Sequence, residues 1–126
     1  MDCIKSYEIM QELDYRFSNP MRPFYHPRCE DMSLAGVLYA LGDPVRLQII
    51  TRLAKTGELT CSDLDCAVAK STMSHHFKIL RESGLVLTRK EGTQHINTLR
   101  RADLDRLYPG LLAAVLHHSS HPLVPT

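Results

Sequence analysis

The segment KSTMSHHFKILRESG, at residues 70–84, carries the chemistry that says most about this chain. Its apolar residues recur every three or four positions, which predicts an amphipathic helix with Ser71 or Thr72 as its cap. A donor-rich, basic face opposite an apolar stripe suits a helix that lies in a DNA major groove, and an ordinary surface helix is the alternative. The stripe is Met73, Phe77 and Leu80, and the other face holds Lys70, Ser74, His75, Lys78 and Arg81.

The charge of the 126-residue chain is unevenly distributed, although its formal net charge is only +1. Residues 70–101 hold seven Lys or Arg against two acidic residues, whereas residues 1–43 hold four basic and seven acidic residues. Such asymmetry indicates a surface that binds a polyanion such as nucleic acid.

Composition narrows the class of protein further. The four cysteines form no C-x-x-C pair, and 44% apolar residues can supply a core, so we expect a reducing, cytoplasmic compartment. No run approaches the roughly 20 apolar residues of a membrane span and no signal sequence opens the chain, so we expect no membrane partner. No nucleophile–base set, phosphate loop or pair of buried carboxylates is visible, so we expect no enzyme.

The periodicity of the sequence predicts a mainly α (α+β) fold. Apolar stripes and capping residues place helices at about 3–17, 31–41, 44–55, 60–67, 70–84 and 109–118. After Gly84 the period changes to 2, which predicts strands at 85–89 and 94–99 joined by a turn. A hairpin directly after a two-helix unit is the winged helix-turn-helix arrangement, here with about five or six helices and a two-stranded wing.

Three regions follow from this pattern. Residues 1–30 form an N-terminal helix and a proline-containing arm, and residues 31–118 form the DNA-binding and dimerisation domain. Residues 119–126 form a C-terminal tail. The terminal helix is more apolar than one small domain needs to expose, which agrees with a dimer.

Four segments follow one another along the chain: LGDPVRLQIITRL (41–53), ELTCSDL (58–64), KSTMSHHFKILRESGLV (70–86) and RKEGTQHI (89–96). In this order and at this spacing they resemble the ArsR/SmtB family of dimeric bacterial repressors. The resemblance covers about two-thirds of the chain and implies a homodimer whose recognition helices read an inverted-repeat, double-stranded DNA operator until an inducer releases them. It implies DNA contacts at Lys70, Ser71, Thr72, Ser74, His75 and Lys78, with Arg89, Lys90 and Gln94 from the wing. Arg81, on the same basic face of the 70–84 helix, is a further candidate from its position alone.

The resemblance weakens at the effector site. Arsenic and cadmium sensors of the family usually show E-L-C-x-C-D-L, but here Thr60 and Ser62 stand at the two ligand positions. Sensors that use the terminal helix show D-x-H-x10-H-x2-E, which makes Asp105, His118 and His121 candidate metal ligands, with Leu107 in place of the first histidine.

Thiol chemistry is the other route to an effector. Cys29, with His26 of the arm, is a candidate partner for Cys61 or Cys66, and arsenic(III) or a sulfur oxidant suits such thiols. The alternatives are that Cys61 is buried, that Cys66 is an incidental exposed thiol and that residues 25–27 simply dock the arm. No cofactor is required, and a metal ion or arsenic(III) is a candidate effector only.

Two other functions remain open from the sequence. Winged helices also serve as protein-interaction modules, which would predict an acidic or apolar outer face on the 70–84 helix rather than the basic one seen here. A metal-binding sensor using the terminal histidines is the second alternative. His75 is expected to meet DNA, whereas His76 is expected at the edge of the core.

Overall fold

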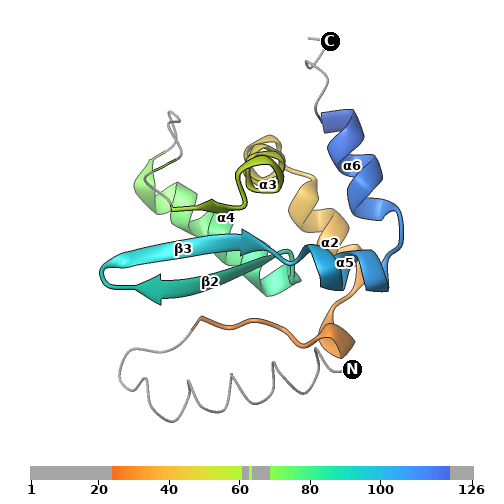
Figure 1. Cartoon of the computed structure of the whole chain (residues 1–126), viewed down its shortest axis with the longest axis horizontal. Helices are drawn as coiled ribbons and strands as arrows, with labels where there is room; N and C mark the ends of the chain where they lie inside the picture. Colours follow the sequence, from red (N-terminus) through yellow and green to blue (C-terminus); the bar gives the residue numbers. More distant parts are fainter. Residues whose placement is uncertain (1–23, 61–62, 64–68, 120–126) are drawn as a thin grey trace.

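The protein combines a bundle of helices with a small antiparallel sheet (Figure 1). The computed structural model describes residues 24–60, 63 and 69–119. The predicted helix at 3–17, most of the 60–67 helix and the tail after 119 lie outside these residues. Within the described part of the chain, no helix is long and apolar enough to cross a bilayer.

The helices of the described residues confirm the mainly helical prediction. The 3-10 helix η1 (Cys29–Asp31) is followed by the helices α2 (Leu34–Leu41), α3 (Pro44–Thr56), α4 (Lys70–Ser83), α5 (Arg101–Leu107) and α6 (Leu111–Ser119). The predicted 31–41 helix begins later, because Ser33 Oγ accepts the Gly36 amide at 3.0 Å and so caps α2. Asp43 caps α3 in the same way, with Pro44 as its first residue.

The predicted cap of the recognition helix is wrong. The residue before α4 is Ala69, which offers no side-chain cap, and both Ser71 and Thr72 lie within the first turn with their side chains exposed. Their hydroxyls are therefore free of a capping role and point away from the core. The helix ends at Gly84, in the left-handed conformation, as predicted.

The wing has one more strand than predicted. The strands β2 (Val86–Glu91) and β3 (Gln94–Leu99) pair from Val86↔Leu99 to Glu91↔Gln94 around a two-residue turn. The short strand β1 (Glu58–Leu59) adds to the free side of β3, so the sheet order is β1-β3-β2. A two-residue strand leaves no alternating pattern, which is why the sequence predicted only two strands.

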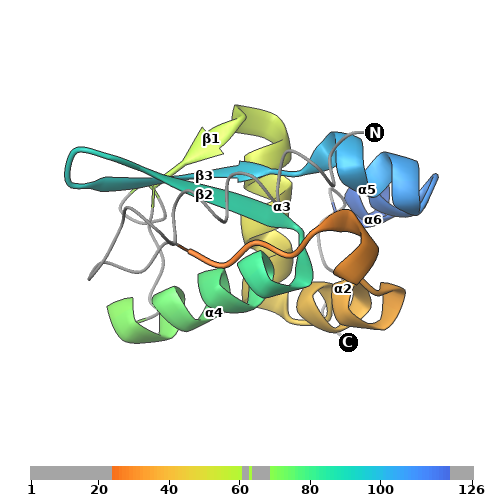
Figure 2. The ribbon, with the colours of Figure 1, turned by 90° about the horizontal axis from the view of Figure 1, so that it is seen from below.

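The core lies where α2, α3 and α4 meet the sheet. Met73, Phe77 and Leu80 face inward from α4 and pack with buried residues of α2, α3 and β2, as their spacing predicted. Figure 2 shows α4 running alongside the hairpin, with residues 24–28 following the seam between α4 and β2. Burying one face of α4 in this way leaves the opposite face to solvent.

Gly84 is expected to be the most sensitive glycine of the fold. Its φ of 92° disfavours any side chain, and an added Cβ would overlap the Met32 side chain. Gly92 also has a positive φ, 62°, but has open space around it. Gly84→Ala should therefore lower the free energy of unfolding by clearly more than the roughly 1 kcal/mol expected of Gly92→Ala. Chemical denaturation of both variants checks this, and equal losses would contradict it.

Candidate nucleic-acid interface

The outer face of α4 is a continuous donor surface. Six of the side chains predicted to meet DNA are exposed on it, whereas the residues between them are buried. No described carboxylate interrupts this face before Glu82. The six are Lys70, Ser71, Thr72, Ser74, His75 and Lys78.

The three wing residues predicted to meet DNA are all exposed, and one of them is paired with carboxylates. Lys90 and Gln94 are exposed next to the hairpin turn. Arg89 is exposed as well, but its guanidinium contacts Glu58 and Glu91, both at 2.9 Å. These hydrogen bonds, to Glu91 first and then Glu58, raise the pKa of Arg89 and offset much of its charge. Its attraction for a phosphate is correspondingly reduced.

Arg81 is only partly exposed, and its side chain contacts Phe24 of the N-terminal arm. Its guanidinium lies 4.3 Å from the centre of the Phe24 ring, within the range of a cation–π interaction. Of the ten predicted DNA contacts, Arg81 is therefore the one that the structure turns toward the protein's own N-terminal arm.

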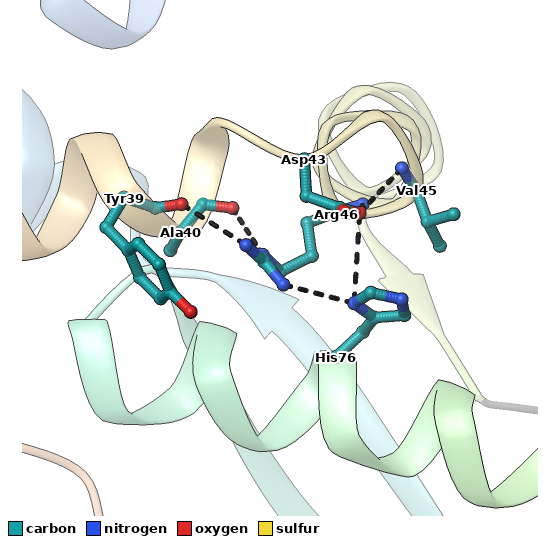
Figure 3. A network of polar contacts seen from close by, with 6 residues as sticks. All are labelled: Tyr39, Ala40, Asp43, Val45, Arg46 and His76. Carbon is teal, nitrogen blue, oxygen red and sulfur yellow. Dashed lines mark hydrogen bonds and ion pairs between the residues drawn. The ribbon is translucent and has the colours of Figure 1, made fainter.

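A buried arginine holds α4 in one orientation relative to α2 (Figure 3). Arg46 is 7% exposed and donates to Ala40 O at 2.7 Å, Tyr39 O at 3.3 Å and His76 Nδ1 at 3.2 Å. The first two acceptors are carbonyls in the last turn of α2, and the third comes from α4. His76 therefore lies at the core edge, as predicted, facing away from the donor surface that holds His75.

Asp43 completes this cluster from the turn between α2 and α3. Its Oδ2 accepts the amides of Val45 and Arg46 and lies 3.8 Å from His76 Nδ1. Burial would raise the pKa of Asp43, but the two amide hydrogen bonds and the nearby Arg46 guanidinium hold it below its usual value. Asp43 thus stays ionised beside the buried guanidinium.

A second network of hydrogen bonds runs across the sheet. His26 Nε2 accepts the Thr88 amide at 3.0 Å, Thr88 Oγ1 donates to Asn97 Oδ1 at 2.6 Å, and Asn97 Nδ2 donates to Leu59 O at 3.1 Å. This network joins the arm to β2, β3 and β1 in turn. Asn97 and Thr88 are 1% and 6% exposed, so their hydrogen bonds are made away from water.

The candidate effector residues are not gathered into one site within the described residues. Asp105 lies on α5 and His118 on α6, both exposed, and His118 stacks edge-on against His117. No group of three or more potential metal ligands occurs in that part of the chain. His121, Cys61 and Cys66 lie outside it.

Cys29 differs from the free thiol that the sequence suggested. It is 3% exposed and disulfide-bonded, and it is the one cysteine within the described residues. Arg106 of α5 donates to its Sγ at 3.2 Å. The disulfide departs from the reducing environment that the cysteine pattern led us to expect.

Sequence reasoning missed the buried arginines. Arg100 was counted in the basic stretch, but it is 3% exposed, contacts Asp103 at 3.2 Å and donates to Pro27 O at 2.9 Å. Arg46 was read only as part of a family motif. A signal exists in hindsight, since each arginine stands three residues from an aspartate beside a helix start.

Comparison with known proteins agrees with this geometry. A family model for a helix-turn-helix domain matches residues 41–89. The uncharacterized HTH-type transcriptional regulator YceK of Bacillus subtilis is 40% identical over 66% of this chain and 86% of its own length. The arsenical resistance operon repressor of Staphylococcus xylosus is 39% identical over 62% of this chain and 76% of its own length.

The solved structures give the same result. The transcriptional repressor BigR from Xylella fastidiosa superposes with a TM-score of 0.55 at 29% identity. The match covers 71% of this chain and 88% of BigR. The fold of most of the described residues is therefore similar to that of a known repressor.

His26 should make the stability of the protein depend on pH. Burial first, and then the charges of Arg100 and Arg81, lower its pKa from 6.5 to about 4. Since the unfolded chain takes up a proton near pH 6.5 and the folded chain does not until about pH 4, stability falls as the pH drops through this window. The loss attributable to His26 is roughly 2 kcal/mol, after discounting for its partial exposure. Denaturant unfolding of wild type and His26→Gln at pH 7 and pH 4.5 measures this loss. If the variant loses as much stability between the two pH values as wild type does, His26 is not its source.

Proposed function

The chain belongs to the ArsR/SmtB family of winged helix-turn-helix transcriptional regulators, and on that premise we propose that it is a homodimeric repressor of an inverted-repeat operator. It is a DNA-binding regulator, and the family is one of regulators rather than enzymes. The observation that carries the proposal is the exposed donor face of α4 beside the wing. An interaction module would present an acidic or apolar face there.

The face of α4 divides into two kinds of contact. Ser71, Thr72, Ser74 and His75 present short polar groups suited to base edges, whose donors and acceptors differ among the four base pairs in the major groove. Lys70 and Lys78 present charges suited to phosphates, which fix position and give salt-dependent affinity.

The wing adds contacts to the backbone of the duplex. Lys90 and Gln94 are exposed near its turn and reach outward from the sheet. Arg89 joins them only if a phosphate replaces Glu58 or Glu91 as its partner, and Arg81 only if it leaves Phe24. Both are therefore secondary contacts in this proposal.

The apolar face of α2 supports the dimer. Leu34 and Leu38, which lie on the apolar stripe of α2 with the buried Val37 and Leu41, are 47% and 48% exposed, and Tyr39 is 66% exposed. Both views place α2 near α6, which carries the half-buried residues Leu111, Val115 and Leu116, at the end of the molecule away from the wing turn (Figures 1 and 2). A second copy placed by a two-fold axis would cover this surface with the same surface of its own.

Thiol modification is the effector that we place first. Cys29 is buried, disulfide-bonded and in contact with Arg106 at the base of the arm. Oxidation or reduction of its sulfur would therefore change how the arm is attached. Cys61 and Cys66 are the further cysteines in this proposal, and arsenic(III) would bind the same sulfur atoms when they are reduced to thiolates. A metal site at Asp105, His118 and His121 ranks below it, because the first two lie on separate helices.

Fluorescence anisotropy tests the proposal. The reduced protein is titrated onto the DNA upstream of its own gene and onto a scrambled duplex of the same composition, then again after peroxide, arsenite or zinc. We expect tight, salt-sensitive preference for the upstream duplex and release by peroxide or arsenite. Zinc as the only releasing agent would move the effector to the histidine site, and no DNA binding would favour an interaction module.

Truncating Lys78 and truncating Ser74 should change DNA binding in different ways. Lys78→Ala should weaken binding to all duplexes and reduce the slope of log affinity against log salt by about one, since one phosphate contact is lost. Ser74→Ala or His75→Ala should relax preference at particular base pairs by about 1–3 kcal/mol, with little change on scrambled DNA. Anisotropy on a panel of singly substituted duplexes distinguishes them. Equal losses on specific and scrambled DNA for all three variants would rule out this division.

Leu38→Glu should separate the protomers. The substitution places a charge in the centre of the proposed apolar interface, where it loses its hydration, whereas Gln48→Glu places the same charge on the exposed side of α3. Sedimentation velocity should show a dimer for wild type and Gln48→Glu and a monomer for Leu38→Glu. A dimer in all three would move the interface elsewhere.

A further inference from the structure

Residues 24–28, here called the arm, follow the seam between the recognition helix and the wing (Figure 2). They are extended and form no helix or strand of their own. Among the described residues β2 is at the edge of the sheet, and no strand of that part of the chain pairs with its outer side. The arm lies where such a strand would be.

His26 attaches the arm to this edge. Its Nε2 accepts the Thr88 amide at 3.0 Å, which requires a neutral imidazole with its proton on Nδ1. Through Thr88 the contact continues to Asn97 and to Leu59 of β1, so it braces all three strands. Losing it would leave a half-buried amide of the wing without this acceptor.

Phe24 joins the two DNA-facing elements directly. Its ring meets His95 of β3 edge-on, with centroids 4.9 Å apart, and carries the Arg81 guanidinium of α4 at 4.3 Å on its face. One side chain of the arm thus contacts both the wing and the recognition helix. Neither His95 nor Arg81 needs to move for the other contact to form.

The base of the arm is anchored in the same way. Arg100, at the end of β3, donates to Pro27 O at 2.9 Å, and Arg106 of α5 donates to Cys29 Sγ at 3.2 Å. Met32 then packs on Gly84, in the turn that connects α4 to β2. The chain from Phe24 to Met32 therefore contacts the last turn of α4, the turn that follows it, and both strands of the wing.

We propose that Phe24 and His26 are positioning residues for DNA binding: the arm holds the wing at a fixed angle to the recognition helix. Neither residue is assigned a contact with DNA. The inference rests on the proposed function for its consequence, since the angle sets whether α4 and the wing engage their grooves together. It also assigns Arg81 to holding the arm rather than to a base or phosphate.

Variants of the arm separate this role from general stability. His26→Ala removes the acceptor, His26→Gln restores one without a titratable ring, and Phe24→Ala removes the link between Arg81 and His95. Tyr25→Ala is the matched control, since Tyr25 lies between them and is 55% exposed. None of the four changes the charge at neutral pH, so binding that depends on charge alone should be unaffected.

Two measurements are made on the full-length protein at pH 7.5, well below its melting temperature. Hydrogen exchange of the free protein follows the peptides of β2–β3 and of α4, and anisotropy follows binding to the upstream and scrambled duplexes. His26→Ala and Phe24→Ala should speed exchange in β2–β3 and weaken binding to the upstream duplex by about tenfold, with little change on scrambled DNA. His26→Gln should recover most of the wild-type behaviour, and Tyr25→Ala should match wild type.

The outcomes distinguish the two proposals. If wild type prefers the upstream duplex but the His26 and Phe24 variants behave like Tyr25→Ala in both measurements, the arm is not a positioning element. If His26→Ala and Phe24→Ala lose affinity equally on both duplexes, or if His26→Gln fails to recover, the positioning role is also overturned. If wild type shows no preference, that operator assignment fails, while hydrogen exchange still decides whether the arm braces the wing.

Discussion

The guanidinium of Arg46 joins three helices at the point from which the DNA-reading face is presented. A charge removed from water must be hydrogen-bonded, and each nitrogen of the Arg46 guanidinium has a partner. Two partners are carbonyls at the end of α2, where the helix macrodipole is negative, and the third is His76 of α4. Because a guanidinium only donates, His76 Nδ1 must carry a lone pair. Rotating α4 would leave a buried donor unpaired, so its outer face keeps one orientation relative to α2.

The same chemistry divides the basic residues into two groups. Arg46 and Arg100 are buried, Arg89 is paired with carboxylates and Arg81 is stacked on Phe24, so the arginines mainly organise the protein. Planar guanidinium groups suit such fixed, multidentate contacts. In the proposed interface the exposed charges come instead from lysines, and the groups suited to distinguishing bases are hydroxyls and an imidazole. Affinity and specificity are therefore assigned to different side chains, namely Lys70, Lys78 and Lys90 for the first and Ser71, Thr72, Ser74 and His75 for the second.

Much of this was predictable from the sequence because it depends on local patterns. The three- and four-residue spacing of Met73, Phe77 and Leu80 gave the buried face of α4 correctly, and the change to a period of 2 gave the hairpin. Contacts between distant segments were not predictable. Nothing near His26 in the sequence indicates that it accepts the amide of Thr88, 62 residues away, and the net charge of a segment does not reveal that Arg100 is buried. The proposed DNA contacts remain predictions, although the side chains of α4 among them are exposed as their roles require.

A double-mutant cycle between Arg46 and His76, scored by affinity for the preferred duplex, tests most directly whether this contact orients the recognition helix. Arg46→Ala and His76→Ala should each lower the affinity for the preferred duplex. The affinity of the double variant should be only slightly below that of the weaker-binding single variant, which corresponds to a coupling free energy of about 1–2 kcal/mol. Arg52→Ala, an exposed arginine on α3, should bind like wild type. Losses that simply multiply, or single variants that bind like wild type, would show that α4 is oriented by core packing alone.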